Sequence, residues 1–487
     1  MLLPVQVSQA QLPSLGDGVD LSPGAERRLG DRIIRELYRD PDYLDDPVVI
    51  EYVVGIWQPL LQAARKRGDL PPELDDRFSW EILLGRDRSV NAFALPGGYL
   101  GLHLGLVAVV TSRDELASVL AHELSHVTQR HISRLMSKQD SLSPWVLASM
   151  VLASVAASKN PELAKAVIVG SQAAASQSQI NFTRDMEMEA DRVGFGVMGQ
   201  AGFDQHGFVS MFEKLDQANR LTDNGSYPYL RSHPLTSARI SDMRARMPID
   251  SHGATAAPPQ LAHSMVAARA RSLAYPTADQ LRAWAAEPGA GGFAGRPPAQ
   301  RAAALYAAAA AQARLRDFAR ATATAAQLRA LAGSDAAAAR QARILSAEIA
   351  MAAGDLPGAQ ELLEASARPL PRPERLLLTQ VHLRAGRASQ AVDLMQPWVA
   401  DAPHDATAWT LLSSAYEAQG QTLRAIRASG EAQMAHLDYA GAVDRFKAAR
   451  ALASKGSLAA SDHVEASIID TRLRQAEQLL REQALER

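Results

Sequence analysis

Apolar side chains recur at helical spacing along much of the chain. Over residues 26–70 they return every three or four positions, which is the period of an amphipathic helix. The period is clearest from Asp114 to about Met136, where one apolar stripe predicts a single helix packed against a core. Residues 162–220 keep the same pattern. We therefore expect a mainly α-helical protein.

A different pattern between residues 78 and 107 predicts a small β-sheet. Apolar runs at 80–84 and 92–95 have the length of strands, and a Pro-Gly-Gly turn follows at 96–98. A hairpin or short sheet fits these signals. The domain that contains them is therefore expected to be α+β, with a small sheet among helices.

The C-terminal part of the chain shows a regular repeat. Residues 287–300 are rich in Pro and Gly, which predicts a domain boundary. Beyond it, a glycine followed five positions later by an alanine occurs at Gly354 and Ala359, Gly386 and Ala391, and Gly420 and Ala425. The spacing is close to the period of about 34 residues of tetratricopeptide repeats, whose helix pairs stack into an α-solenoid. An alanine-rich bundle without true repeats is the alternative.

Composition excludes several function classes. The chain has 487 residues, too many for one ordinary core, so we expect two or three domains. With 51 Lys and Arg against 53 Asp and Glu, the net charge is −2, and no basic field is available to hold nucleic acid. The chain has no cysteine, so any metal must be held by His, Asp or Glu.

Two segments bear on where the protein is located. Residues 1–10 lack a basic start but end in Ser8-x-Ala10, a pattern that signal peptidase accepts. We interpret them as the remnant of an export signal cleaved after Ala10; an ordinary frayed terminus is the alternative. Residues 144–158 are apolar but shorter than the roughly 20 residues of a bilayer span, so we expect a buried or interfacial helix and no membrane-spanning segment.

The main chemical motif lies on the helix predicted from Asp114. His122, Glu123 and His126 form H-E-x-x-H. Because positions i and i+4 share one face of a helix, both imidazoles can reach one zinc ion while the carboxylate lies beside a water molecule. A catalytic zinc site needs a third protein ligand. His131 lies at the wrong helical phase for that task, and we expect it to be exposed.

A second helix offers the missing ligand. Glu187 and Asp191 are also four residues apart and share a face. Glu187 could bind the zinc, and Asp191 could accept a hydrogen bond from the outer nitrogen of a ligand histidine. The pattern alone leaves two alternatives open, namely Glu189 as the ligand and a solvated run of charges without a metal.

These motifs resemble a known family. H-E-L-S-H at 122–126, followed by E-x-x-A-D at 187–191, resembles the gluzincin zinc metallopeptidases that include the CAAX prenyl protease and HtpX. The segment 91–98 is similar to the same family. Without spanning helices and with a repeat array, the chain is most similar to the periplasmic members. On this basis we expect a signal remnant and arm (1–25), a zinc metalloprotease domain (26–260), a connecting segment (261–300), and a tetratricopeptide-repeat domain with a capping helix (301–487).

The resemblance implies roles for individual residues. His122, His126 and Glu187 would be the zinc ligands, and Glu123 the general base of peptide hydrolysis. An edge strand would bind an extended substrate by main-chain pairing, and it would consist of Asn91, Ala92, Phe93 and Ala94.

The resemblance also singles out a histidine in a loop. His233 would fill the open zinc position and keep the enzyme latent. Pro234 after it favours an extended backbone, as in a loop that reaches into a cleft. From the residues alone, a His-Pro pair in a loop is more often without a function.

The biological role is implied by the resemblance as well. A periplasmic enzyme of this type would degrade misassembled outer-membrane β-barrel proteins and assist their assembly. Its repeats would dock on the β-barrel assembly machinery. Two alternatives remain: a chaperone or scaffold that works through its repeats with a latent zinc site, and a membrane-bound protease of the CAAX or HtpX type.

Overall fold

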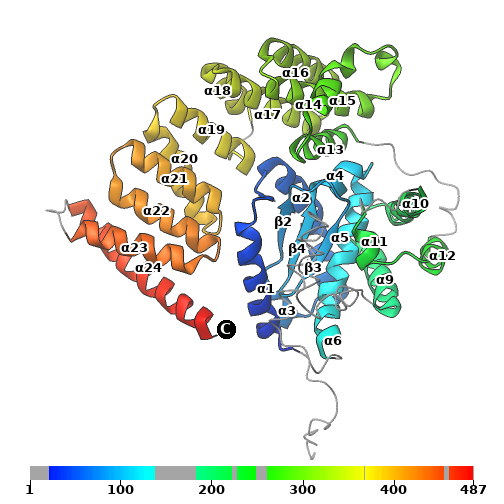
Figure 1. Cartoon of the computed structure of the whole chain (residues 1–487), viewed down its shortest axis with the longest axis horizontal. Coiled ribbons are helices and arrows are strands. Elements are labelled where there is room, and N and C mark those ends of the chain that lie inside the picture. Colours follow the sequence, from blue (N-terminus) through cyan, green and yellow to red (C-terminus); the bar gives the residue numbers. More distant parts are fainter. Residues whose placement is uncertain are drawn as a thin grey trace, which may run out of the picture.

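The computed structural model describes residues 21–137, 183–221, 227–247, 260–366, 368–454 and 460–485. It is mainly helical with one small sheet, which confirms the predicted fold class (Figure 1). The expected cleavage after Ala10 and the apolar segment 144–158 lie outside the described residues. Among the helices that are described, none combines the length and apolar character needed to cross a bilayer.

The sheet has four strands in the order β1-β2-β4-β3. The strands are β1 (Tyr43–Leu44), β2 (Glu81–Gly85), β3 (Ala92–Leu95) and β4 (Tyr99–His103). β2 and β4 are parallel, whereas β1 pairs with β2 and β3 pairs with β4 in antiparallel register. β3 therefore forms one edge of the sheet, as the family resemblance implied for this segment.

Helices cover both faces of the sheet (Figure 1). On one face, Ile33 and Ile34 of α1 (Pro23–Arg39) pack against Tyr99 and its neighbours. On the other face, the alternate strand residues pack against α2 (Pro47–Arg67) and α5 (Arg113–Thr128). The remaining helices of this part are α3 (Pro72–Asp75), α4 (Leu104–Val109), α6 (His131–Ser137), α9 (Arg184–Gln200), α10 (His206–Leu221), α11 (Tyr229–Ser232) and α12 (Ser237–Arg246).

The helix that carries the H-E-x-x-H motif is shorter than predicted. The hydroxyl of Ser112 accepts the N–H of Glu115 at 3.0 Å and starts α5. The expected continuation to Met136 is wrong, because α5 ends at Thr128 and Arg130 adopts a left-handed conformation with φ 54°. The chain turns there before α6 begins, and periodicity did not reveal this break.

The C-terminal half is an array of helix pairs. Gly354, Gly386 and Gly420 have positive φ angles of 90°, 72° and 71°, which glycine adopts without strain, and each follows the first helix of a pair. The helices are α13 (Leu261–Leu273), α14 (Ala278–Ala286), α15 (Pro298–Arg314), α16 (Phe318–Ala332), α17 (Ala336–Ala353), α18 (Leu356–Glu364), α19 (Arg372–Arg384), α20 (Ala388–Asp401), α21 (Ala406–Ala418), α22 (Thr422–Ala435), α23 (Tyr439–Ala453) and α24 (Ala460–Leu485).

The predicted linker contains two short 3-10 helices, η3 (Glu287–Gly289) and η4 (Phe293–Gly295). α13, which precedes it, contributes Val266 to the core around the sheet and Met265 to the core of the first helices of the array. The domain limits at 260 and 300 stay a prediction.

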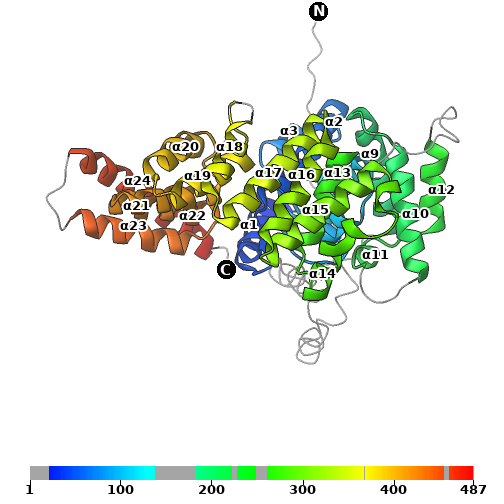
Figure 2. The same ribbon diagram turned by 90° about the horizontal axis from the view of Figure 1, so that it is seen from above.

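Buried and half-buried ion pairs join the array to the sheet-containing part. Arg269 of α13 lies 2.7 Å from both Asp46 and Glu348. Arg372 of α19 bonds the carboxylates of Asp45 and Asp405. Figure 2 shows α15 to α17 over the sheet-containing part and α20 to α24 extending to its left. The two halves are therefore packed on each other near the start of α2.

Candidate metal centre

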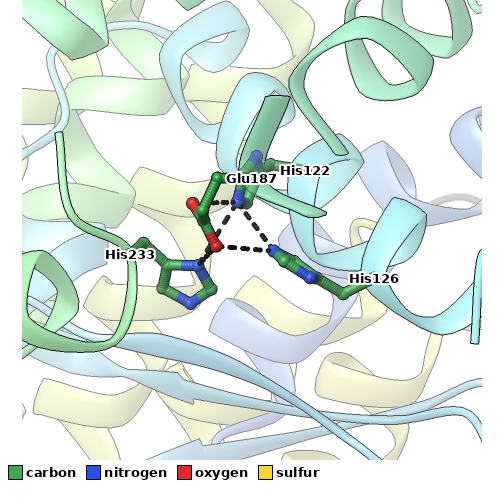
Figure 3. A group of neighbouring side chains, drawn as sticks. All are labelled: His122, His126, Glu187 and His233. Atoms are coloured by element: carbon green, nitrogen blue, oxygen red, sulfur yellow. Dashed lines mark hydrogen bonds and ion pairs between the residues drawn. The ribbon is translucent and has the colours of Figure 1, made fainter. Parts of the chain in front are cut away.

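Four buried side chains from three parts of the chain converge on one point. His122 and His126 come from α5, Glu187 comes from α9, and His233 follows directly after α11 (Figure 3). One ligand atom from each lies within 4.8 Å of all the others. The structure thus brings together the three predicted ligands and the predicted fourth one.

The distances within this cluster suit a tetrahedral metal ion. His122 Nε2 lies 2.9 Å from His126 Nε2 and 3.3 Å from His233 Nδ1. Glu187 Oε1 lies 3.0 Å from His233 Nδ1 and 3.4 Å from His126 Nε2. A zinc ion with ligands at about 2.0–2.1 Å places its ligand atoms about 3.3 Å from one another. The donor set of three imidazoles and a carboxylate therefore fits such an ion.

Charge in the cluster favours a cation. Burial would raise the pKa of Glu187, but the neighbouring His233, His122 and His126 hold it well below its usual range. Burial lowers the pKa of His126. Burial acts on His122 in the same direction, yet hydrogen bonds to Asp191 and Glu187 raise its pKa to about 9. An ionised carboxylate thus lies among imidazoles in a buried position, where a divalent ion would balance its charge.

Asp191 lies where the sequence predicted. Its Oδ1 is 2.9 Å from His122 Nδ1, the nitrogen that faces away from the cluster. Arg239 of α12 binds both oxygens of Asp191, at 2.6 and 2.8 Å. Arg239 Nη1 also lies 2.7 Å from Glu187 Oε2 and donates to the carbonyl of Pro234 at 2.9 Å.

Arg239 is a residue that sequence reasoning missed. A buried Asp191 requires a cation, which is a signal that an arginine should be near. The chain has 51 Lys and Arg, however, and their order does not say which of them approaches.

Glu123 faces both the cluster and the sheet edge. Its Oε2 accepts the backbone N–H of Ala94 at 2.9 Å. Its Oε1 makes no hydrogen bond within the described part of the chain and lies 3.4 Å from His233 Nε2. The main effect on the pKa of Glu123 is burial, which raises it. A carboxylate with a raised pKa is suited to exchange a proton with a reacting group.

The backbone groups of β3 that do not pair with β4 point to the side on which Glu123 lies. The N–H of His103 donates to the carbonyl of Asn91 at 3.0 Å, and Phe93 is opposite Gly101. In an antiparallel ladder, the intervening residues Ala92 and Ala94 then direct their N–H groups to the open side. The predicted edge strand begins one residue later than expected, since Asn91 precedes β3.

The structure changes the expectations for two neighbouring residues, His131 and Glu189. The prediction that His131 is exposed is wrong, since it is fully buried and its Nδ1 lies 2.8 Å from His126 Nδ1. The break at Arg130 turns His131 back toward the end of α5. Glu189 does not join the cluster: its Oε2 lies 3.2 Å from His131 Nε2, and its side chain is 32% exposed.

Tyr229 is a second residue that the sequence did not reveal. Its ring stacks on His233 with centroids 4.6 Å apart and planes inclined by 29°. Its N–H donates to the carbonyl of Val90 at 3.3 Å, just before the edge strand. The loop of His233 is therefore held close to the start of β3.

Comparison with known proteins shows which family the part of the chain around this site is similar to. Residues 60–247 match the model of peptidase family M48, and this range includes all four residues of the cluster together with Glu123. Over this range the chain is similar to peptidase family M48. The predicted resemblance to a metallopeptidase family is thereby confirmed. The helix pairs lie outside the matched range, and their assignment as tetratricopeptide repeats stays a prediction.

Curated relatives are similar over part of their length. A putative beta-barrel assembly-enhancing protease of Vibrio cholerae is 37% identical over 238 residues, which are 48% of this chain and 47% of the relative. The beta-barrel assembly-enhancing protease of Escherichia coli is 35% identical over 244 residues, 48% of this chain and 47% of the relative. The mitochondrial metalloendopeptidase OMA1 of Saccharomyces cerevisiae is 27% identical over 201 residues, 40% of this chain and 55% of the relative. The matches to the two assembly-enhancing proteases thus span about half of each relative.

Proposed function

We propose that the chain is a zinc-dependent endopeptidase. The observation that carries the proposal is the convergence of His122, His126 and Glu187 on one point, with Glu123 beside it. In the proposal, the first three side chains bind the zinc ion and Asp191 orients His122. Bound zinc would supply a Lewis acid for the scissile carbonyl and for water.

Glu123 would move the proton. It would take a proton from water as the water attacks the peptide carbon, and it would pass that proton to the departing amine. An extended substrate would add to β3, because Ala92 and Ala94 direct their N–H groups to the open side. The bond of Glu123 to Ala94 supports this arrangement, since it fixes the base beside the strand that would bind the substrate.

Cleavage of an unfolded protein by the purified chain tests this function. We expect cleavage that a chelator abolishes and zinc restores. Glu123→Gln should lower the rate by about 10²–10⁴-fold while zinc stays bound, because the amide cannot take the proton. Glu213→Gln changes an exposed carboxylate that pairs with Arg244, so it is the matched control and should cleave at the rate of the wild type. Equal rates for Glu123→Gln and the wild type would contradict the proposal.

We further propose that His233 keeps the enzyme latent. Its Nδ1 lies within the ligand cluster, while its Nε2 lies 3.4 Å from Glu123 Oε1. One imidazole would thus fill the fourth metal position and also face the general base. The stacking of Tyr229 and the bond of Arg239 to Pro234 hold this loop in place.

The activity of His233→Ala tests the latency. The variant should cleave an unfolded protein faster than the wild type at equal zinc content, because a water molecule can enter the vacated position. A slower variant would contradict a purely inhibitory role.

The names of the relatives support a proposal about the biological setting. We place the chain in the periplasm of a Gram-negative bacterium, where it would degrade misassembled outer-membrane β-barrel proteins and assist their assembly. Unfinished barrels have strand edges without partners, which suits addition to β3. The array, as a tetratricopeptide-repeat domain, would dock on the β-barrel assembly machinery. Site-specific crosslinking from α21 in cells should capture that machinery, and capture of unrelated proteins alone would contradict the docking.

A chaperone or scaffold role is the second candidate. The position of His233 in the ligand cluster favours this role. If His233 fills the fourth metal position, the site cannot bind water there, and the helical array would carry the function. In a strain without the native protein, Glu123→Gln should then support outer-membrane assembly as well as the wild type does. Failure of that variant would favour the peptidase role instead.

A further inference from the structure

A line of polar contacts leads from His126 away from the metal position. His126 Nδ1 lies 2.8 Å from His131 Nδ1. His131 Nε2 lies 3.2 Å from Glu189 Oε2, and Arg134 donates to the same oxygen at 2.9 Å. Both histidines are fully buried. The contacts therefore form a continuous path from a ligand imidazole to a partly exposed ion pair.

The partners along this path determine where the protons lie. Beside Arg134, the Glu189 carboxylate is an acceptor, so His131 donates from Nε2. His131 Nδ1 then carries a lone pair, and the hydrogen between the two Nδ1 atoms belongs to His126. Since a neutral imidazole has one N–H, the Nε2 of His126 is left with a lone pair, and this atom faces the cluster.

We propose that His131 is a positioning residue of the metal centre, which accepts the Nδ1 hydrogen of His126 and so holds the His126 ring with Nε2 toward the metal. The inference rests on the proposed metal site. Ligand histidines generally donate their outer N–H to a fixed acceptor, which sets the tautomer and the ring orientation. His122 has Asp191 for this task. For His126, the structure assigns the task to a second imidazole.

The local backbone explains how His131 reaches this position. Arg130 adopts φ 54°, and its side chain donates to the hydroxyl of Ser133 at 3.2 Å. The turn places His131 at the first position of α6, directed back at α5. Glu189 lies on α9, the helix that also supplies Glu187. The path thus links three helices around one ligand.

Zinc affinity of the purified full chain tests the proposal. Zinc is titrated against a competing chelator, and the absorption spectrum of the cobalt-substituted protein reports the ligand geometry. His131→Phe keeps a ring but removes the acceptor, so we expect zinc affinity to fall by about 10–100-fold and the cobalt spectrum to change. His131→Gln can accept through its amide oxygen and should recover most of that loss.

Two further variants separate this role from a general effect on folding. His263→Phe replaces another buried histidine, which lies 2.8 Å from the hydroxyl of Tyr52, and it should leave zinc affinity unchanged. Glu189→Leu changes a partly exposed side chain. The zinc affinity of this variant should lie between the zinc affinities of the wild type and of His131→Phe. Wild-type affinity in His131→Phe, or an equal loss in His131→Gln, would overturn the proposal. A wild type that binds no zinc would overturn the metal site itself, and this inference with it.

Discussion

At the scale of residues, the candidate metal centre depends on buried side chains whose opposite charges balance one another. Arg239 binds Asp191 with two hydrogen bonds and also lies beside Glu187. The sequence predicted Glu187 and Asp191 because their spacing puts both on one face of α9. The sequence could not predict that Arg239 and His131 lie at this centre. The position of Arg239 depends on how α12 packs, and that of His131 depends on the left-handed residue Arg130.

Replacement of Arg239 should therefore lower the stability of the fold. Arg239→Met leaves the buried carboxylate of Asp191 without its cation, and we expect the free energy of unfolding to fall by about 3–5 kcal/mol. Arg244→Met on the same helix is the matched control. The Arg244 ion pair with Glu213 is exposed, so its loss should cost less than about 1 kcal/mol. Urea unfolding measures both values, and equal losses would contradict this account.

At the scale of elements, helix α1 packs closely on the sheet whose edge strand is β3. Periodicity predicted α1, and the burial of Ile33 and Ile34 agrees with it. The sequence did not reveal how closely α1 approaches the turn between β3 and β4. A Cβ atom on Gly30 would lie only 2.0 Å from the backbone oxygen of Pro96, so only glycine permits this contact.

Two glycines in helices should consequently respond in opposite directions to the same change. Gly30→Ala should destabilise the protein by about 1–3 kcal/mol, because backbone at Pro96 must shift. Gly55→Ala in α2 meets no atom within 4 Å and should stabilise by about 0.5–1 kcal/mol, because alanine has the higher helix propensity. Thermal unfolding compares the two. A stabilising Gly30→Ala would show that α1 does not lie so close to the turn.

At the scale of the whole molecule, ion pairs near the start of α2 join the array to the sheet. Glycine spacing predicted the helix pairs because each turn needs a positive φ. The same spacing says nothing of how the array docks. Docking depends on Arg269, Arg340 and Arg372, which reach carboxylates far away in the chain.

The pH dependence of stability should reveal the ion pair within the array that holds Arg372, the arginine that also reaches Asp45. Burial would raise the pKa of Asp405, but its hydrogen bonds to Arg372 hold the pKa below the usual value. A lowered pKa in the folded state gives stability that is present above about pH 4 and is lost as the pH falls further. Asp405→Asn keeps the capping side chain of α21 but removes the charge.

We therefore expect Asp405→Asn to be less stable than the wild type at pH 7. The difference should narrow as the pH falls below about 4, where the wild-type carboxylate takes up a proton. Urea unfolding at a series of pH values measures this difference. A constant gap at every pH would contradict the assigned role of the Asp405 charge.

Zinc X-ray absorption on the purified chain tests the central claim most directly, because it counts the ligands around the metal. The account predicts one zinc per chain with three imidazoles and one carboxylate, from His122, His126, His233 and Glu187. In His233→Ala, it predicts one zinc with two imidazoles. A chain that binds no stoichiometric zinc, or an imidazole count that is unchanged in His233→Ala, would contradict it.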